Sequence, residues 1–353
     1  MRVRPGWLHL VQSPQYAATG MLAALVVVLL LFPLQVRAED TRPPFNEWLA
    51  GIKQQAREQG ITEQTIALLD DIEPDERVIG FDRRQPEFVQ TFDEYLTARV
   101  TDYRIRRARE EFAANREALQ KIGKAYGVDP WFLVAFWGLE SSFGQYQGKY
   151  SILRSLATLA YDPRRTTFFT RQLLAALSIL DEGHVPPEEF VGGWAGAMGQ
   201  NQFIPTSFLR YAQDFDGDGH KNIWSNQLDV WASIAYYLAS NGWREGAGWG
   251  AQVEVPADFD FEALKPDSVP AGCRALRYHT KKLPVSEWTR LGITGDLTGL
   301  PGGEYALIIP DEKDASRWLV GGNFRSILSY NCANKYAVSV GLLADEVMKS
   351  RVP

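Results

Sequence analysis

The feature that most constrains this chain is an uncharged run of residues, 131–139 (WFLVAFWGL), which ends at Glu140. Asp129 and Pro130 precede the run, and these residue types favour the N-cap and the first position of a helix. A helix that is apolar on all sides has to be buried. The sequence therefore predicts a central helix surrounded by other elements, with Asp129 capping its start.

Glu140, at the end of this helix, is the residue that could take part in a chemical reaction. Phe136 and Trp137 lie four and three positions before it and share its face of the helix. Burial disfavours the charged form of a carboxyl, so we expect the pKa of Glu140 to be raised. A carboxyl that stays protonated near neutral pH can act as the general acid of glycosidic-bond cleavage. The alternative is a structural glutamate that caps or hydrogen-bonds a neighbouring helix.

Size and charge narrow the class of protein. The chain has 353 residues, 45% of them apolar and 23% charged, which supports a large core in two or three domains or subdomains. Its formal net charge is -6. Phosphate binding needs a basic surface, so nucleic acid is not expected as the main partner.

The N-terminus predicts a targeting segment. Two arginines near the start precede an apolar run over residues 21–32, and a small-residue cleavage site ends at Ala38. We expect a signal peptide that is cleaved after Ala38. The alternative is an uncleaved inner-membrane anchor, for which the apolar run is short. No cysteine lies near residue 38, so a lipoprotein is not expected.

The two cysteines, Cys273 and Cys332, leave two alternatives open. In an exported protein they can form a disulfide. Otherwise they are two separate, partly buried thiols. Together with four scattered histidines they give no spacing that is typical of a zinc site.

The remaining pattern predicts an α+β protein that is predominantly helical. Apolar residues recur at helical spacing in several stretches, whereas short β-prone pieces alternate with Pro and Gly between residues 246 and 310. The helical stretches are 46–59, 88–112, 151–160, 166–181, 228–240 and 334–348, and the β-prone pieces are 252–255 and 306–309.

Four longer motifs resemble one known family. They are GLESSFG (138–144), GKYSILRSLATLAYDPRR (148–165), GWAGAMGQNQFIPTSF (193–208) and DFDGDGHKNIW (214–224). In this order and spacing they resemble the lytic murein transglycosylases of type B, from about Phe81 to the C-terminal region. The resemblance implies a lysozyme-like core with an added helical domain and a small β-containing lobe.

This resemblance also gives the expected domain order. The domains are the signal peptide (1–38), a helical domain (39–120), the catalytic core (121–245, with a loop at 214–225), a small mixed or β lobe (246–320) and a C-terminal helix returning to the core (321–353).

The implied activity is cleavage of the β-1,4 bond between N-acetylmuramic acid and N-acetylglucosamine in peptidoglycan, with no organic cofactor. Glu140 would be the single acid/base. It would protonate the leaving oxygen and then accept the proton of the C6 hydroxyl that attacks C1, which yields a 1,6-anhydromuramoyl end. The second carboxylate's role would pass to the N-acetyl group of the substrate. Consistent with this, the loop after Glu140 has no acid before Asp162.

The same resemblance implies residues that line a sugar cleft. Gln202 lies in the QFIP motif, and Tyr330 and Asn331 form the C-terminal YN motif. Tyr237 and Tyr95 match further lining positions, although ordinary packing is the alternative for both tyrosines.

A glycine-rich loop around Trp194 suggests a backbone that approaches a ligand closely, and a tight turn is the alternative. The clearest departure from the family is Gly193. The family usually has a serine there, whose hydroxyl helps to hold the N-acetyl group. Glycine supplies only backbone, which puts the efficiency of catalysis in question.

The loop at 214–225 matches the first half of an EF-hand calcium loop. Such a loop takes side-chain oxygens at positions 1, 3, 5 and 12 and a backbone carbonyl at position 7. These positions are Asp214, Asp216, Asp218, Ser225 and His220. Serine replaces the usual bidentate glutamate at position 12, so we expect a weak structural Ca²⁺ site. The alternative is an acidic turn without metal.

Two other functions remain open on the sequence alone. One is a hydrolytic muramidase, which needs a second carboxylate or a positioned water. The other is a non-catalytic or weakly active peptidoglycan-binding protein, suggested by Gly193. For the leading function we expect a periplasmic monomer with peptidoglycan glycan strands as its partner and the cell-wall synthesis machinery as a further candidate.

Overall fold

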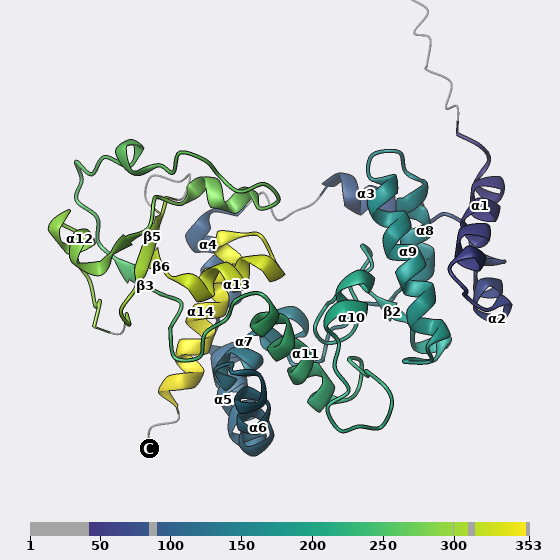
Figure 1. Cartoon of the computed structure of the whole chain (residues 1–353), viewed down its shortest axis with the longest axis horizontal. Coiled ribbons are helices and arrows are strands. Elements are labelled where there is room, and N and C mark those ends of the chain that lie inside the picture. Colours follow the sequence, from purple (N-terminus) through teal and green to yellow (C-terminus); the bar gives the residue numbers. More distant parts are fainter. Residues whose placement is uncertain (1–41, 85–89, 299, 310–314, 351–353) are drawn as a thin grey trace, which may run out of the picture. The chain divides into compact units, whose positions relative to one another are not determined.

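A computed structural model describes residues 42–84, 90–298, 300–309 and 315–350. The predicted central helix is α7 (Pro130–Ser141), in which every residue from Phe132 to Gly138 is buried. This confirms the prediction of a buried helix. The helices that pack directly on it are α5 (Asp102–Ala114), α6 (Arg116–Tyr126), α11 (Gln227–Ser240) and α14 (Asn334–Lys349) (Figure 1).

Asp129 is the N-cap residue of α7 and Pro130 is the first helical residue, as predicted, but the Asp129 side chain makes no capping hydrogen bond. The buried carboxylate instead accepts hydrogen bonds from Trp243 Nε1 and from Gly246 N, each at 3.2 Å. A buried carboxylate needs several donors, and the segment after α11 provides them. These hydrogen bonds of Asp129 connect the start of α7 to the segment after α11.

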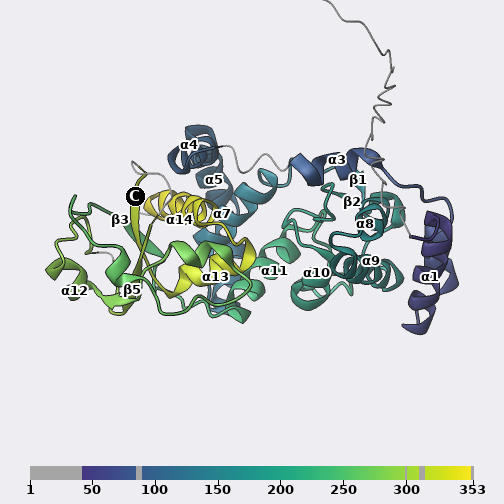
Figure 2. The same ribbon diagram turned by 90° about the horizontal axis from the view of Figure 1, so that it is seen from above.

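A second group of helices carries the glycine-rich loop. α8 (Ile152–Tyr161) and α9 (Thr166–Asp181) run side by side, and α10 (Pro205–Tyr211) packs on α9 (Figure 2). Strand β1 (Tyr150–Ser151) pairs antiparallel with β2 (Val191–Gly192). This short ladder joins the loop after α7 to the start of the glycine-rich loop.

The helices of the expected domain 39–120 contribute to both groups. α1 (Phe45–Glu58), α2 (Glu63–Ile66) and α3 (Glu76–Arg84) pack on α8 or α9, whereas α4 (Phe92–Arg99) and α5 pack on α14. From Pro43 onward the chain forms one compact unit, so the domain boundaries remain predictions.

The expected continuous helix over 88–112 is interrupted. Val100 leaves the helical conformation at the end of α4. Thr101 then accepts a hydrogen bond from Arg104 N at 3.2 Å and caps the start of α5. Threonine is a good N-cap because its hydroxyl satisfies one of the free amides of the first turn.

The β lobe is a four-stranded antiparallel sheet in the order β3-β6-β5-β4. The β-prone piece 252–255 overlaps β3 at its first two residues and the piece 306–309 overlaps β5 at its first three, whereas β6 was not predicted. Trp288, Leu307 and Leu319 form the centre of a separate small core beneath the sheet. The elements are β3 (Gly250–Val253), β4 (Leu283–Pro284), α12 (Val285–Arg290), β5 (Glu304–Ile308) and β6 (Arg317–Val320).

The C-terminal region contains two helices where one was expected. α13 (Gly322–Tyr330) and α14 are separated by extended backbone at Asn331 and Ala333. Between them, Cys332 forms a disulfide with Cys273, with a Cα–Cα distance of 5.4 Å. The disulfide attaches this break to the segment that precedes the 3-10 helix η5 (Arg274–Tyr278).

The predicted signal peptide, residues 1–38, lies outside the described residues. Among the residues that are described, no helix is both long enough and apolar enough to cross a membrane.

Candidate active site

Glu140 lies in the last turn of α7, where the backbone takes an unusual path. Ser142 and Phe143 have φ values of 49° and 60°, and Gly144 follows at 81°. The left-handed region is unfavourable for residues other than glycine, and such strain is common at functional sites. Ser141 Oγ supports the turn by accepting a hydrogen bond from Gly144 N at 3.0 Å. The turn thus ends the buried helix directly after Glu140.

The Glu140 carboxyl is half-buried and accepts a hydrogen bond from the Tyr336 hydroxyl. Burial raises the pKa of Glu140 to about 7, and the hydrogen bond from Tyr336 and the charge of Arg99 oppose that rise. The predicted direction is confirmed. Near neutral pH the carboxyl is divided between its protonated and ionised forms, which suits a group that has to act as acid and then as base.

Tyr336 was not among the predicted site residues. It lies 196 residues after Glu140 on α14, and it reaches the carboxyl because α14 packs on α7. The only signal in the sequence is helical spacing, which places Tyr336 on the same face as Val340 and Leu343, both buried. Such a tyrosine looks like ordinary core until its partner is known.

Tyr330 lies in an aromatic wall beside this carboxyl. Its ring centroid is 4.8 Å from that of Phe136, 4.8 Å from Tyr237 and 5.6 Å from Phe203. The Tyr330 hydroxyl donates to the Asn201 carbonyl at 2.5 Å. The Tyr237 hydroxyl donates to the carbonyl of the residue before Tyr330, at 2.6 Å. Tyr237 is therefore a packed tyrosine that supports Tyr330.

Tyr95 lies between two cations. Arg99 Cζ is 5.2 Å and Lys335 Nζ is 5.4 Å from the centroid of its ring. Burial, followed by the charge of Glu140, raises the pKa of Tyr336 well above its usual value, and Tyr95 adds a smaller effect. Asn331 is exposed at the break after α13.

The glycine-rich loop fixes Gln202 in a left-handed conformation with φ 52°. Its Nε2 donates to the carbonyls of Gln147 at 3.1 Å and Gly199 at 2.9 Å. A Cβ added to Gly193 would lie 3.6 Å from both Ala197 Cβ and Gln202 Oε1, which is ordinary contact. The backbone therefore has room for the serine that the resemblance implies at this position.

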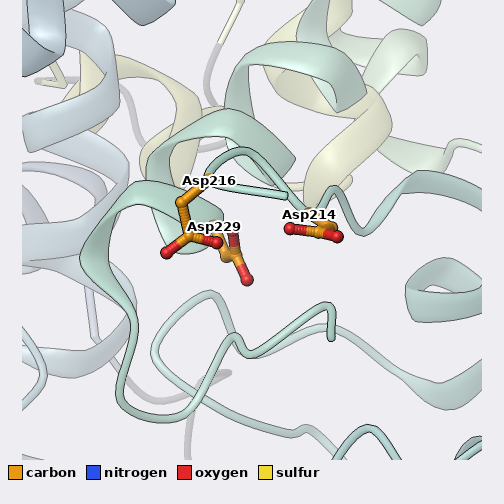
Figure 3. Close-up of side chains that lie close together, drawn as sticks. All are labelled: Asp214, Asp216 and Asp229. Carbon is orange, nitrogen blue, oxygen red and sulfur yellow. The ribbon is translucent and has the colours of Figure 1, made fainter. Parts of the chain in front are cut away.

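A second group of acids lies in the predicted calcium loop. Asp214, Asp216 and Asp229 each place a carboxylate oxygen within 4.8 Å of the others (Figure 3). Asp229, in the first turn of α11, was not predicted because it falls beyond the twelve-residue motif. Burial, followed by the charges of Asp216 and Asp214, raises its pKa to about 6.

The predicted ligand Asp218 is not part of this group of three carboxylates. Asp218 Oδ1 accepts a hydrogen bond from His220 N at 2.8 Å, and Ser225 Oγ accepts one from Asn222 Nδ2 at 2.8 Å. The structure therefore brings together two of the predicted acids and adds Asp229. Carboxylate oxygens are the ligands that Ca²⁺ prefers, so the residues fit this ion.

Residues 44–345 match the family model described as Transglycosylase SLT domain. The chain is 33% identical over 238 residues to the membrane-bound lytic murein transglycosylase B of Escherichia coli K12. That alignment covers 67% of this chain and 62% of the relative, less than two thirds of its length.

Solved structures of lytic transglycosylases are also similar to this chain. SltB3 from Pseudomonas aeruginosa, in complex with NAG-anhNAM-pentapeptide, has a TM-score of 0.78 and 40% identity, covering 87% of this chain and 80% of its own. A lytic transglycosylase of Escherichia coli in complex with calcium has a TM-score of 0.71 and 26% identity, covering 88% and 94%. The chain therefore belongs to the lytic transglycosylases with an SLT domain, whose core is lysozyme-like.

Proposed function

We propose that this chain is a peptidoglycan lytic transglycosylase that cleaves the bond between N-acetylmuramic acid and N-acetylglucosamine and leaves 1,6-anhydromuramoyl ends. The observation that carries the proposal is the Glu140 carboxyl, whose pKa burial raises to about 7 while Tyr336 donates to one of its oxygens. The family and its solved complexes with peptidoglycan fragments support the substrate class.

In the first step, protonated Glu140 gives its proton to the glycosidic oxygen as the bond to C1 breaks. In the second, the Glu140 carboxylate takes the proton of the muramoyl C6 hydroxyl, whose oxygen forms the new bond to C1. The carboxyl ends as it began, and no water is consumed. The bond from Tyr336 to Oε1 leaves Oε2 free for both transfers.

The N-acetyl carbonyl of the substrate would stabilise positive charge at C1 between these steps. Gln202 and Gly193 lie next to each other in the glycine-rich loop and are the residues that we assign to this group. Tyr330, Tyr95 and Asn331 would contact the sugars. Tyr237 would act indirectly, because its hydroxyl is bonded to the backbone next to Tyr330.

For calcium, we infer a structural site held by Asp214, Asp216 and Asp229, supported by the relative solved with calcium. A bound Ca²⁺ would offset the repulsion among the three carboxylates and connect the loop to the start of α11. His220 would contribute only its backbone carbonyl.

For location, we propose export with cleavage after Ala38 and action in the periplasm as a monomer. The relative described as membrane-bound supports an envelope location. The cell-wall synthesis machinery stays a candidate partner.

The test is mass spectrometry of muropeptides released from isolated sacculi by the purified protein and by Glu140→Gln. General acid–base catalysis contributes about 10²- to 10⁴-fold, so the variant should release almost nothing. Anhydromuramoyl ends from the wild type alone support the proposal. Reducing ends would indicate a hydrolytic muramidase, and binding without release would indicate a non-catalytic wall-binding protein.

A further inference from the structure

An unassigned cavity lies between the β lobe and the start of α13. Its volume is about 170 Å³, and its wall includes Leu276, Val320 and Phe324. Pockets for small-molecule ligands have volumes of about 300–1,000 Å³, so this cavity suits only the end of a short chain.

The charged groups of the wall are all basic. Lys281, Lys282 and Arg325 line the cavity, and none of the described lining residues carries a carboxylate. This is unusual in a chain of net charge -6. Lys281 is paired at 3.0 Å with Asp267, whose carboxylate side chain is 93% exposed. Lys282 and Arg325 are the cations that we assign to a ligand.

The fold adds a further attraction for an anion. Gly321, at the cavity wall, precedes α13, and the helix has no side-chain cap and no acid in its first turn. The amides at a helix N-terminus favour negative charge.

His279, a buried residue of the cavity wall, carries no charge at neutral pH. It is buried, and its Nε2 faces Asn334 Oδ1 at 2.8 Å. Asn334 Nδ2 donates to the Ala275 carbonyl, so Asn334 Oδ1 accepts and His279 Nε2 donates. Burial, with smaller effects of Arg325 and Lys282, lowers the pKa of His279 to about 4. The ring is thus neutral at neutral pH and leaves an acceptor nitrogen, Nδ1.

The cavity is within reach of a peptide attached to the sugar at the active site. His279 at the cavity wall is bonded to Asn334, the first residue of α14. Tyr336, two residues later on that helix, donates to Glu140. An extended pentapeptide spans up to about 17 Å. The related SltB3 was solved with a pentapeptide-bearing fragment, so chains of this length occur on substrates of the family.

We propose that this cavity binds the free C-terminal carboxylate of the peptide carried by the muramoyl sugar, with the carboxylate at Lys282 and Arg325 and a small side chain against the apolar wall. This inference rests on the proposed function for its substrate class. It makes the enzyme selective for strands with full-length, uncrosslinked peptides.

The test uses N-acetyl-Lys-D-Ala-D-Ala as the probe and its C-terminal amide as the matched ligand, in calorimetric titrations with the full chain. The amide should bind at least about tenfold more weakly, since one charge-assisted contact is lost. Lys282→Ala/Arg325→Ala should lose binding to a similar degree. Arg290→Ala, an exposed cation of the same lobe bonded to Glu287, is the control and should bind as the wild type does.

Equal affinity for acid and amide, or unchanged affinity in the double variant, would overturn the proposal. So would displacement by inorganic phosphate at equal affinity, which would mean a general anion site. Unfolding temperatures of the variants, compared with that of Arg290→Ala, exclude loss of fold as the cause. Probe binding by Glu140→Gln should equal that of the wild type. If the wild type binds the probe but releases no anhydromuramoyl ends, the proposed function fails while the cavity assignment stands.

Discussion

Glu140 and Asp229 are both acids whose pKa burial raises, to about 7 and about 6 respectively. Their neighbours differ. Glu140 lies beside aromatic rings and one neutral hydroxyl, whereas Asp229 faces the carboxylates Asp216 and Asp214. The first arrangement favours a protonated carboxyl, whereas a bound cation would relieve the repulsion among the carboxylates of the second. A raised pKa therefore does not by itself identify a catalytic acid, because the neighbouring groups decide what the carboxyl does.

The largest expected effect concerns the Tyr336 bond. Tyr336→Phe removes a donor to the Glu140 carboxylate and should lower turnover by about 10- to 100-fold, the value of a hydrogen bond to a charged group. Loss of this donor also raises the pKa of Glu140. Activity that needs protonated Glu140 should therefore persist to higher pH, which a pH profile of anhydromuramoyl release would show.

Tyr305→Phe is the matched control. The Tyr305 hydroxyl donates to the Pro301 carbonyl at 2.7 Å in the β lobe, away from the acid. An equal loss in both variants, or an unshifted profile in Tyr336→Phe, would mean that Tyr336 only supports the fold.

We expect Ca²⁺ to stabilise the loop at 214–225 and to have no effect at the active site. At a free Ca²⁺ concentration of 100 times Kd, binding stabilises the native state by about 2.7 kcal/mol. Asp229→Asn should abolish most of this gain, measured as the calcium-dependent rise in unfolding temperature. Asp218→Asn tests the sequence motif against the structure and should keep most of the gain. If Asp218→Asn lost more of the calcium stabilisation than Asp229→Asn, the twelve-residue motif, not the observed cluster, would form the site.

Glu140→Gln should stabilise the protein in a pH-dependent manner. The pKa of Glu140 is raised from 4.5 in the unfolded chain to about 7 in the native state. The cost of the buried charge is therefore absent below pH 4.5, grows between pH 4.5 and 7, and is complete above pH 7. Allowing for its partial exposure, we expect the variant to be more stable by about 2 kcal/mol at pH 8. Denaturant unfolding at pH 4 and pH 8 measures the free energy of unfolding of both proteins. If the variant and the wild type differed by the same amount at both pH values, the burial argument would be contradicted.

The smallest effect is expected at Gly193. Because a Cβ there makes only ordinary contacts, Gly193→Ser should fold normally and place a hydroxyl near Gln202. A gain of about threefold in the rate of anhydromuramoyl release is expected, less than one kcal/mol. A rate that falls would show that the glycine is adapted to this chain's own substrate.

The parts of this site that depend on local sequence could be predicted. The uncharged run before Glu140 predicts both its burial and the direction of its pKa shift, because helix geometry fixes which neighbours share its face. Tyr336 could not be found in this way, since its role depends on how α14 packs on α7. Asp229 was missed for a related reason: it belongs to the helix that follows the loop and not to the loop motif.

In the fold, too, features set by local sequence could be predicted and features set by distant contacts could not. The helical stretches after residue 150 were predicted to within a few residues, because their apolar spacing is regular. Helix α13 was missed, although α14 begins at Asn334 as predicted. The disulfide between these two helices could not be decided from local sequence, because Cys332 pairs with Cys273, 59 residues away.

The most direct test of the central claim is an NMR titration of the Glu140 side-chain carboxyl carbon, assigned by its absence in Glu140→Gln. We predict a midpoint near pH 7, set by burial, in the protein free of substrate. A midpoint near the ordinary value of 4.5 would contradict the account, because a carboxylate ionised throughout the neutral range could not supply the first proton.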